Sequence, residues 1–101
     1  MRERLCASGD LPEGEVIQVD LGDGRMLAVY RLEGDVFATD DLCSHGDASL
    51  ADGFIENGEI VCPYHMGRFD IRTGEATGAP CSVAIGTYRV QECDGEIVLI
   101  S

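Results

Sequence analysis

Residues 43–65 read CSHGDASLADGFIENGEIVCPYH, and this stretch contains both histidines of the 101-residue chain. Each histidine closely follows a cysteine, first in Cys43-Ser44-His45 and then in Cys62-Pro63-Tyr64-His65. Two thiols and two imidazoles form a metal-binding set. A glycine comes soon after each pair, and glycine lets the backbone fold closely around a metal centre. The spacing predicts that Cys43, His45, Cys62 and His65 lie on two neighbouring loops and bind one metal centre.

Short β-rich segments separated by glycine turns surround this stretch. The chain has 13 glycines, several in Asp-Gly or Asn-Gly pairs, which favour the tight turns of hairpins. The predicted strands cover residues 15–19, 25–32, 35–39, 59–62, 68–71, 85–90 and 96–100. We expect three hairpins, which pair residues 25–32 with 35–39, 59–62 with 68–71, and 85–90 with 96–100. We also expect a short helical turn at residues 49–51. Strands of this length and spacing predict an all-β antiparallel sandwich or barrel.

A structural zinc site is an alternative interpretation of the four residues, since Cys₂His₂ is a common zinc set. It would make the chain a zinc-stabilised interaction module without redox activity. Zinc fingers usually place cysteine beside cysteine and histidine beside histidine on a helix, whereas each loop here carries one of each. A second alternative is that these cysteines and histidines are ordinary core residues.

At these residues the chain resembles the Rieske 2Fe-2S proteins, whose pattern is C-x-H followed, after fifteen to seventeen residues, by C-x-x-H. The resemblance extends through residues 62–70 and to Gly78-Ala79-Pro80, which is similar to the loop that covers the cluster in this family. It implies that one 2Fe-2S cluster is bound, with Cys43 and Cys62 on one iron and His45 and His65 on the other. It also implies a Rieske-like fold with a small cluster-binding subdomain at about residues 42–80 of a single domain, 1–101.

Within this family the chain is similar to the ferredoxins of bacterial aromatic-ring-hydroxylating dioxygenase systems of the biphenyl or benzene type. Respiratory Rieske proteins carry an extra cysteine in each loop, where this chain has Ala48 and Tyr64. The resemblance implies a one-electron carrier, not itself an enzyme, between a flavin-dependent reductase and a terminal Rieske oxygenase. A small Rieske subunit of a nitrite reductase-type enzyme remains the alternative within the family.

The composition limits the partners. Seven basic and nineteen acidic residues give a formal net charge of −12, which disfavours binding to nucleic acid or to an anionic membrane surface. No apolar run approaches the length of a membrane span, and no apolar segment follows the basic start as in a secretory signal. Five cysteines, an odd number, favour a reducing cytoplasm. We expect a cytoplasmic monomer.

Several residues outside the ligand set carry more specific expectations. Asp47 and Asp70 would place negative charge near the cluster, which predicts a reduction potential in the lower part of the Rieske range of about −150 to +300 mV. Met66, Leu50 and Pro80 are expected to form an apolar contact ring around the histidines, although Leu50 fits the core equally well. The remaining cysteines are expected to be small, mostly buried apolar residues: Cys6, Cys81 and Cys93.

Overall fold

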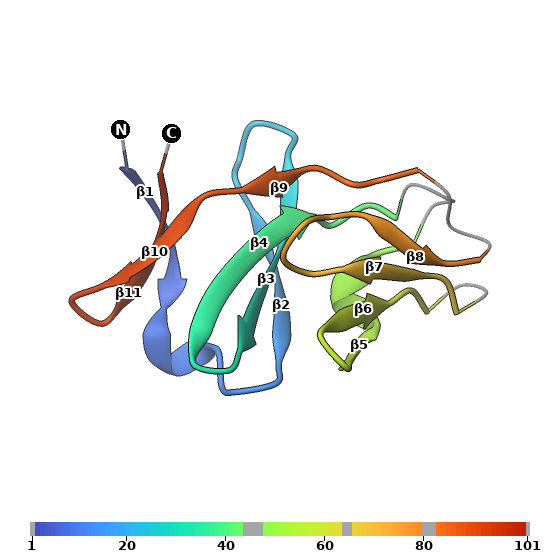
Figure 1. Ribbon diagram of the computed structural model, residues 1–101. Coiled ribbons are helices and arrows are strands. Elements are labelled where there is room, and N and C mark those ends of the chain that lie inside the picture. Colours follow the sequence, from blue (N-terminus) through green and yellow to red (C-terminus); the bar gives the residue numbers. More distant parts are fainter. Residues whose placement is uncertain (1, 44–47, 64–65, 80–82, 101) are drawn as a thin grey trace.

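The computed structural model describes residues 2–43, 48–63, 66–79 and 83–100. Its described residues form three antiparallel sheets, which confirms the all-β prediction (Figure 1). The first sheet has the order β1 (Arg2–Ala7), β11 (Glu96–Ile100) and β10 (Val90–Cys93). The second has the order β2 (Val16–Asp20), β3 (Met26–Leu32), β4 (Asp35–Asp40) and β9 (Thr87–Tyr88). The third has the order β5 (Phe54–Glu56), β6 (Glu59–Val61), β7 (Arg68–Asp70) and β8 (Ala76–Gly78).

Strand β3 is the centre of the fold because both of its faces are buried. Side chains alternate between the two faces of a strand. Leu27 and Val29 pack into one hydrophobic cluster, together with residues of β1 and β11. Ala28 and Tyr30 pack into a second cluster on the other face, which also contains residues of β6 and β7. The second sheet therefore separates two hydrophobic cores, one toward each of the other sheets.

The strands of the third sheet lie between β4 and β9 in the sequence, whereas β4 and β9 are direct neighbours in the second sheet. Residues 38 and 39 of β4 pair directly with residues 88 and 87 of β9. The intervening segment, residues 41–86, contains β5 to β8 and emerges at one end of the second sheet, opposite the first sheet (Figure 1). Both cysteines of the predicted ligand set, Cys43 and Cys62, belong to this segment.

Glycine turns close two of the described hairpins, β10–β11, which was predicted in part, and β5–β6, which was not predicted. Asn57 and Gly58 join β5 to β6, and Asp94 and Gly95 join β10 to β11, all four with positive φ between 52° and 78°. Positive φ at both central residues is typical of type I′ turns, whose twist matches that of the strands. The hairpins β3–β4 and β6–β7 form as predicted.

The predicted strand at residues 85–90 is wrong in its bounds. Thr87 and Tyr88 pair with β4 in the second sheet, and the chain then crosses to the first sheet, where Val90 begins β10. One apolar run is thus divided between two sheets. The sequence pattern also missed three strands, which are β1, β5 and β8.

The described residues contain no α-helix and two short 3₁₀ turns, Ser8–Asp10 and Leu50–Asp52. The second turn lies one residue beyond the helical turn expected at 49–51. No helix of the described residues is long and apolar enough to cross a membrane.

Candidate metal centre

The two cysteines of the predicted ligand set lie in one buried cluster. Cys43 follows β4 after two residues, and Cys62 directly follows β6. Their exposed fractions are 2% and 0%, and both belong to the core cluster that also contains Ala48 and Phe69. Two sulfur atoms that are 19 positions apart in the chain are therefore brought into the same apolar surroundings from two different sheets.

Each cysteine also closes the base of its own loop. The Cys43 backbone N–H donates to the Ala48 carbonyl at 2.9 Å, and the Cys62 N–H donates to the Gly67 carbonyl at 2.7 Å. Both hydrogen bonds span five positions, so the two loops have bases of the same form. His45 and His65, the other two predicted ligands, lie outside the described residues, as do Asp47, Tyr64, Pro80 and Cys81.

The second loop ends in an unusual backbone conformation. Met66 has a φ of 59°, in the left-handed region that non-glycine residues rarely adopt. Its side chain is 55% exposed, in agreement with the expectation that it contributes an apolar surface beside His65 in the chain. Arg68 then begins β7 and pairs with the carboxylates of Glu56 and Glu59.

The prediction that Leu50 belongs to an exposed apolar ring around the histidines is wrong, and the alternative that it is a core residue is confirmed. Its exposed fraction is 0%, and it packs in the core cluster beside Cys43 and Cys62. The 3₁₀ turn that begins at Leu50 directs this side chain inward. Cys6 is buried as expected, and burial raises the pKa of its thiol, whereas Cys93 is half-buried.

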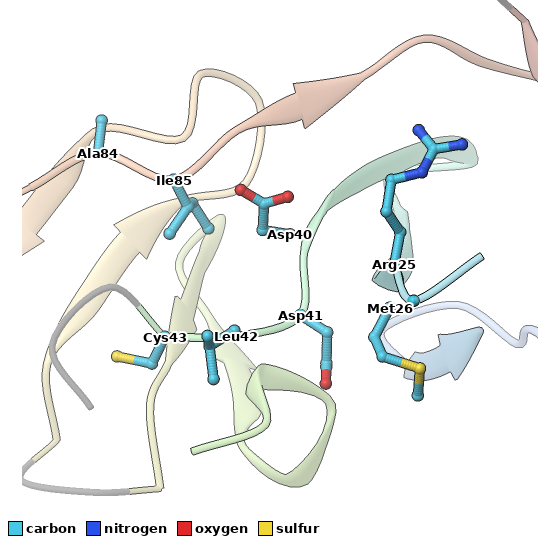
Figure 2. Close-up of a pocket in the computed structure, with 9 residues that line it drawn as sticks. Arg25, Met26, Asp40, Asp41, Leu42, Cys43, Ala84 and Ile85 are labelled. Atoms are coloured by element: carbon cyan, nitrogen blue, oxygen red, sulfur yellow. The ribbon is translucent and has the colours of Figure 1, made fainter. Parts of the chain in front are cut away.

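A groove of about 580 Å³ runs beside Cys43. Cys43, Leu42 and Asp41 form one wall, Ala84 and Ile85 a second, and Arg25 and Met26 a third, as Figure 2 shows. Asp40 lies between the last two and accepts hydrogen bonds from the Gly86 N–H at 2.8 Å and from the Tyr88 hydroxyl. The hydrogen bond from the Tyr88 hydroxyl to Asp40 raises the pKa of Tyr88. The carboxylate thus ties the chain after residue 83 to the end of β4.

The carboxylate next to Asp40 in the chain, Asp41, was not found by sequence reasoning. It is buried, and Gln18, Ser49 and the Ala51 N–H donate to it. The signal was present in the sequence only as an acidic residue two positions before Cys43. Charge alone, however, does not distinguish a buried aspartate from a solvated one.

The described donor set fits a sulfur-ligated group. Two buried thiols on hydrogen-bonded loop bases supply soft ligands within an apolar core cluster, which suits iron–sulfur or zinc centres. Among the described residues no three histidine, cysteine, aspartate or glutamate side chains come together as a metal site. The two cysteine sulfurs lie in one buried cluster, and the ligand set of Cys43, His45, Cys62 and His65 stays a prediction.

Comparison with known proteins distinguishes between these centres. The family model of the Rieske [2Fe-2S] domain matches residues 2–89. The ferredoxin component of the p-cumate 2,3-dioxygenase system of Pseudomonas putida is 48% identical over 94 residues, covering 92% of this chain and 80% of the relative. The ferredoxin component of the naphthalene 1,2-dioxygenase system of Pseudomonas aeruginosa is also 48% identical, over 90% of this chain and 86% of the relative.

The solved structure of the Sphingomonas yanoikuyae B1 ferredoxin superposes with a TM-score of 0.94 at 42% identity, covering 100% of this chain and 99% of that one. This likeness and the family match indicate a Rieske fold with one 2Fe-2S cluster, in place of the zinc alternative. The chain belongs to the Rieske [2Fe-2S] family, among the ferredoxin components of aromatic-ring-hydroxylating dioxygenase systems.

Proposed function

We propose that this protein carries single electrons from a flavin-dependent reductase to the terminal Rieske oxygenase of an aromatic-ring-hydroxylating dioxygenase system. The observation that carries the proposal is the 48% identity, across nine-tenths of the chain, to ferredoxin components of such systems. A related chain, 36% identical with a TM-score of 0.91, was solved in a complex of reduced oxygenase and oxidised ferredoxin of carbazole 1,9a-dioxygenase. That complex supports an oxygenase as the electron acceptor here.

We further propose that Cys43 and Cys62 bind one iron of the cluster and that His45 and His65 bind the other. The buried thiols and the matching loop bases support the cysteine half of this assignment. The cluster supplies reversible one-electron chemistry when it is bound. The protein residues would hold it beside the apolar cluster that contains Cys43 and Cys62, within a cluster-binding subdomain of about residues 42–80 in a single domain, 1–101.

The ligand assignment is tested by four single variants and one control. Cys43→Ser, Cys62→Ser, His45→Ala and His65→Ala are each expected to abolish the electron paramagnetic resonance signal of the dithionite-reduced protein. Cys93→Ser is the matched control, because Cys93 is a half-buried cysteine of β10, outside the third sheet. A wild-type signal in any of the four variants would remove that residue from the ligand set.

The charge distribution supports recognition of partners with basic docking surfaces. All seven basic residues are arginines, and the part of the chain that the structure describes shows ion pairs with carboxylates at five of them: Arg4, Arg25, Arg31, Arg68 and Arg72. Because the positive charges are neutralised locally, the excess of carboxylates determines the field around the protein. Such a field raises the rate of encounter with a positively charged partner, and salt weakens it.

Stopped-flow kinetics test the carrier function. The flavin-dependent reductase is expected to reduce the protein, and the reduced protein is expected to reduce the oxygenase, with second-order rates that fall as salt is added. A protein that stays in a fixed complex with a nitrite reductase-type enzyme would contradict a free, monomeric, cytoplasmic carrier. A midpoint potential well above about 0 mV would contradict the expected low position in the Rieske range.

A further inference from the structure

Asp41 is a buried carboxylate in the core beside the first cysteine loop. Its exposed fraction is 3%, and together with Thr39 it is one of two buried polar residues among those that the structure describes. Burying a carboxylate is costly unless hydrogen bonds replace its water. An acidic side chain at this position therefore requires a specific set of donors.

Three donors converge on the two oxygens of this carboxylate. Ser49 Oγ lies 2.8 Å from Oδ1 and 2.7 Å from Oδ2, and the Ala51 N–H donates to Oδ1 at 3.0 Å. Gln18 Nε2, on β2, donates to Oδ2 at 2.7 Å. No ion pair of the described residues includes Asp41, so its partners are neutral donors and its charge is not cancelled by a neighbouring arginine.

These contacts join the two sides of the first cysteine loop. Asp41 lies on the incoming side, directly after β4, whereas Ser49 and Ala51 lie on the outgoing side. The Asp41 carbonyl also accepts a hydrogen bond from the Leu50 N–H at 2.7 Å. Leu42 and Ser49 form an antiparallel bridge just above, and the Cys43 N–H bonds to Ala48 beyond it. The base of the loop is thus a short series of contacts between its two sides, and those of the Asp41 side chain lie farthest from the loop.

We propose that Asp41 is a positioning residue for the first ligand loop: it holds both sides of the loop together and so fixes the Cys43 sulfur. The inference rests on the proposed role of Cys43 as a cluster ligand. A partner that orients a metal ligand from behind normally affects metal retention, although it never touches the metal. The uncancelled charge of Asp41, two residues from that ligand, also disfavours the addition of an electron nearby.

Two substitutions separate the connection from the charge. Asp41→Asn retains the shape, but it replaces one acceptor oxygen by an NH₂ donor, which faces either the Ala51 N–H or Gln18. Ser49→Ala removes the hydroxyl bond from Ser49 to Asp41 across the loop without changing the net charge. Ser49→Thr keeps the hydroxyl and is the rescue variant. Glu13→Gln is the matched control for charge, because exposed Glu13 accepts the N–H groups of Glu33 and Gly34 at the opposite end of β4.

The measurement is the decay of visible absorbance of each purified, cluster-loaded protein in excess EDTA, together with its midpoint potential. Asp41→Asn and Ser49→Ala are expected to lose the cluster between about 10-fold and about 100-fold faster than wild type. Ser49→Thr and Glu13→Gln are expected to decay at the wild-type rate. The potential is expected to move positive in Asp41→Asn and to stay unchanged in Glu13→Gln.

A wild-type decay rate in Ser49→Ala would overturn the proposal, as would equal acceleration in Glu13→Gln. Ser49→Ala decides the question even where Asp41→Asn does not fold, because Gln18 and the Ala51 N–H still donate to the buried carboxylate. If wild-type protein shows no Rieske signal at all, the proposed ligand set is what fails. The two failures are therefore distinguishable.

Discussion

Adding one methyl group at Gly53 is expected to destabilise the protein strongly. A Cβ atom at this position would lie 1.9 Å from the Val61 carbonyl oxygen and 3.2 Å from that of Leu50. Real Cβ contacts essentially never fall below 3.0 Å, so the Val61 carbonyl would have to move by roughly 1 Å. Val61 is the last residue of β6 and directly precedes Cys62. The displacement would therefore be transmitted to a proposed cluster ligand.

The expected size follows from the nature of the clash. Overpacking costs about 1–3 kcal/mol, and we expect the upper end because the obstacle is backbone and not a flexible side chain. For a domain of about 100 residues, each kcal/mol lowers the midpoint of thermal unfolding by about 4–8 °C. Gly53→Ala should therefore melt about 12–24 °C below wild type.

Far-ultraviolet circular dichroism at a fixed scan rate measures this difference, and visible absorbance at each temperature reports loss of the cluster. The control is Gly9→Ala, because a Cβ at Gly9 meets no atom within 4 Å. Its expected effect is below about 0.5 kcal/mol. A Gly53→Ala protein that melts within about 4 °C of wild type, by the same conversion, would refute the reasoning from the close approach.

Three further substitutions test separate contacts. Leu50→Ala should cost about 2–5 kcal/mol in urea unfolding, yet leave electron-transfer rates at 15 °C unchanged, since the side chain is core and not docking surface. The ion pair with Arg31 lowers the pKa of Glu92 to about 2 from its ordinary 4.5. The stabilisation by this ion pair is therefore present above pH 4.5 and lost as the pH falls toward 2. Glu92→Gln should make the urea midpoint of unfolding depend less on pH across that window. If the variant shows the same pH dependence as wild type, the ion pair is not the cause of that dependence. Tyr88→Phe removes the bond to Asp40 and should cost about 1.5 kcal/mol at pH 7. Because the pKa of Tyr88 is raised above its ordinary 10, this difference from wild type should persist to pH 10 and shrink above it; a difference that does not depend on pH would contradict this.

The hairpins were predictable because local signals specify them. Asp94-Gly95 and Glu33-Gly34 each place a turn between two apolar segments, and both turns occur where the sequence puts them. Strand β1 lacks such a signal, because its partner β11 lies 89 to 98 positions away, in a register from Ala7 with Glu96 to Arg2 with Ile100. Strand β5 has three residues, too few to show an alternation.

The division of residues 85–90 between two sheets shows a second limit. Thr87, Tyr88 and Val90 all favour strands, but whether a β-rich segment stays in one sheet depends on tertiary packing. The same reason explains Leu50, whose burial is determined by a core that includes residues of distant strands.

The candidate centre divides in a similar way. Residue types and spacing predicted the cysteines, because few side chains supply soft metal ligands. The hydrogen bonds at the loop bases, from Cys43 to Ala48 and from Cys62 to Gly67, join backbone groups. Backbone hydrogen bonds of this kind have no side-chain signature, so sequence patterns do not predict them.

The direct pairing of β4 with β9 has a consequence for how such a protein changes over time. The chain leaves the second sheet after residue 40 and returns to it at residue 87, beside the point of departure. A segment that begins and ends at neighbouring positions can lengthen, shorten or be exchanged while the strands on either side stay paired. The core of Leu27, Val29 and Ile97 lies on the far face, and none of the described residues of that segment belongs to it. Evolution, or an engineer, can therefore alter the electron-carrying part of the molecule while its supporting half keeps the same fold.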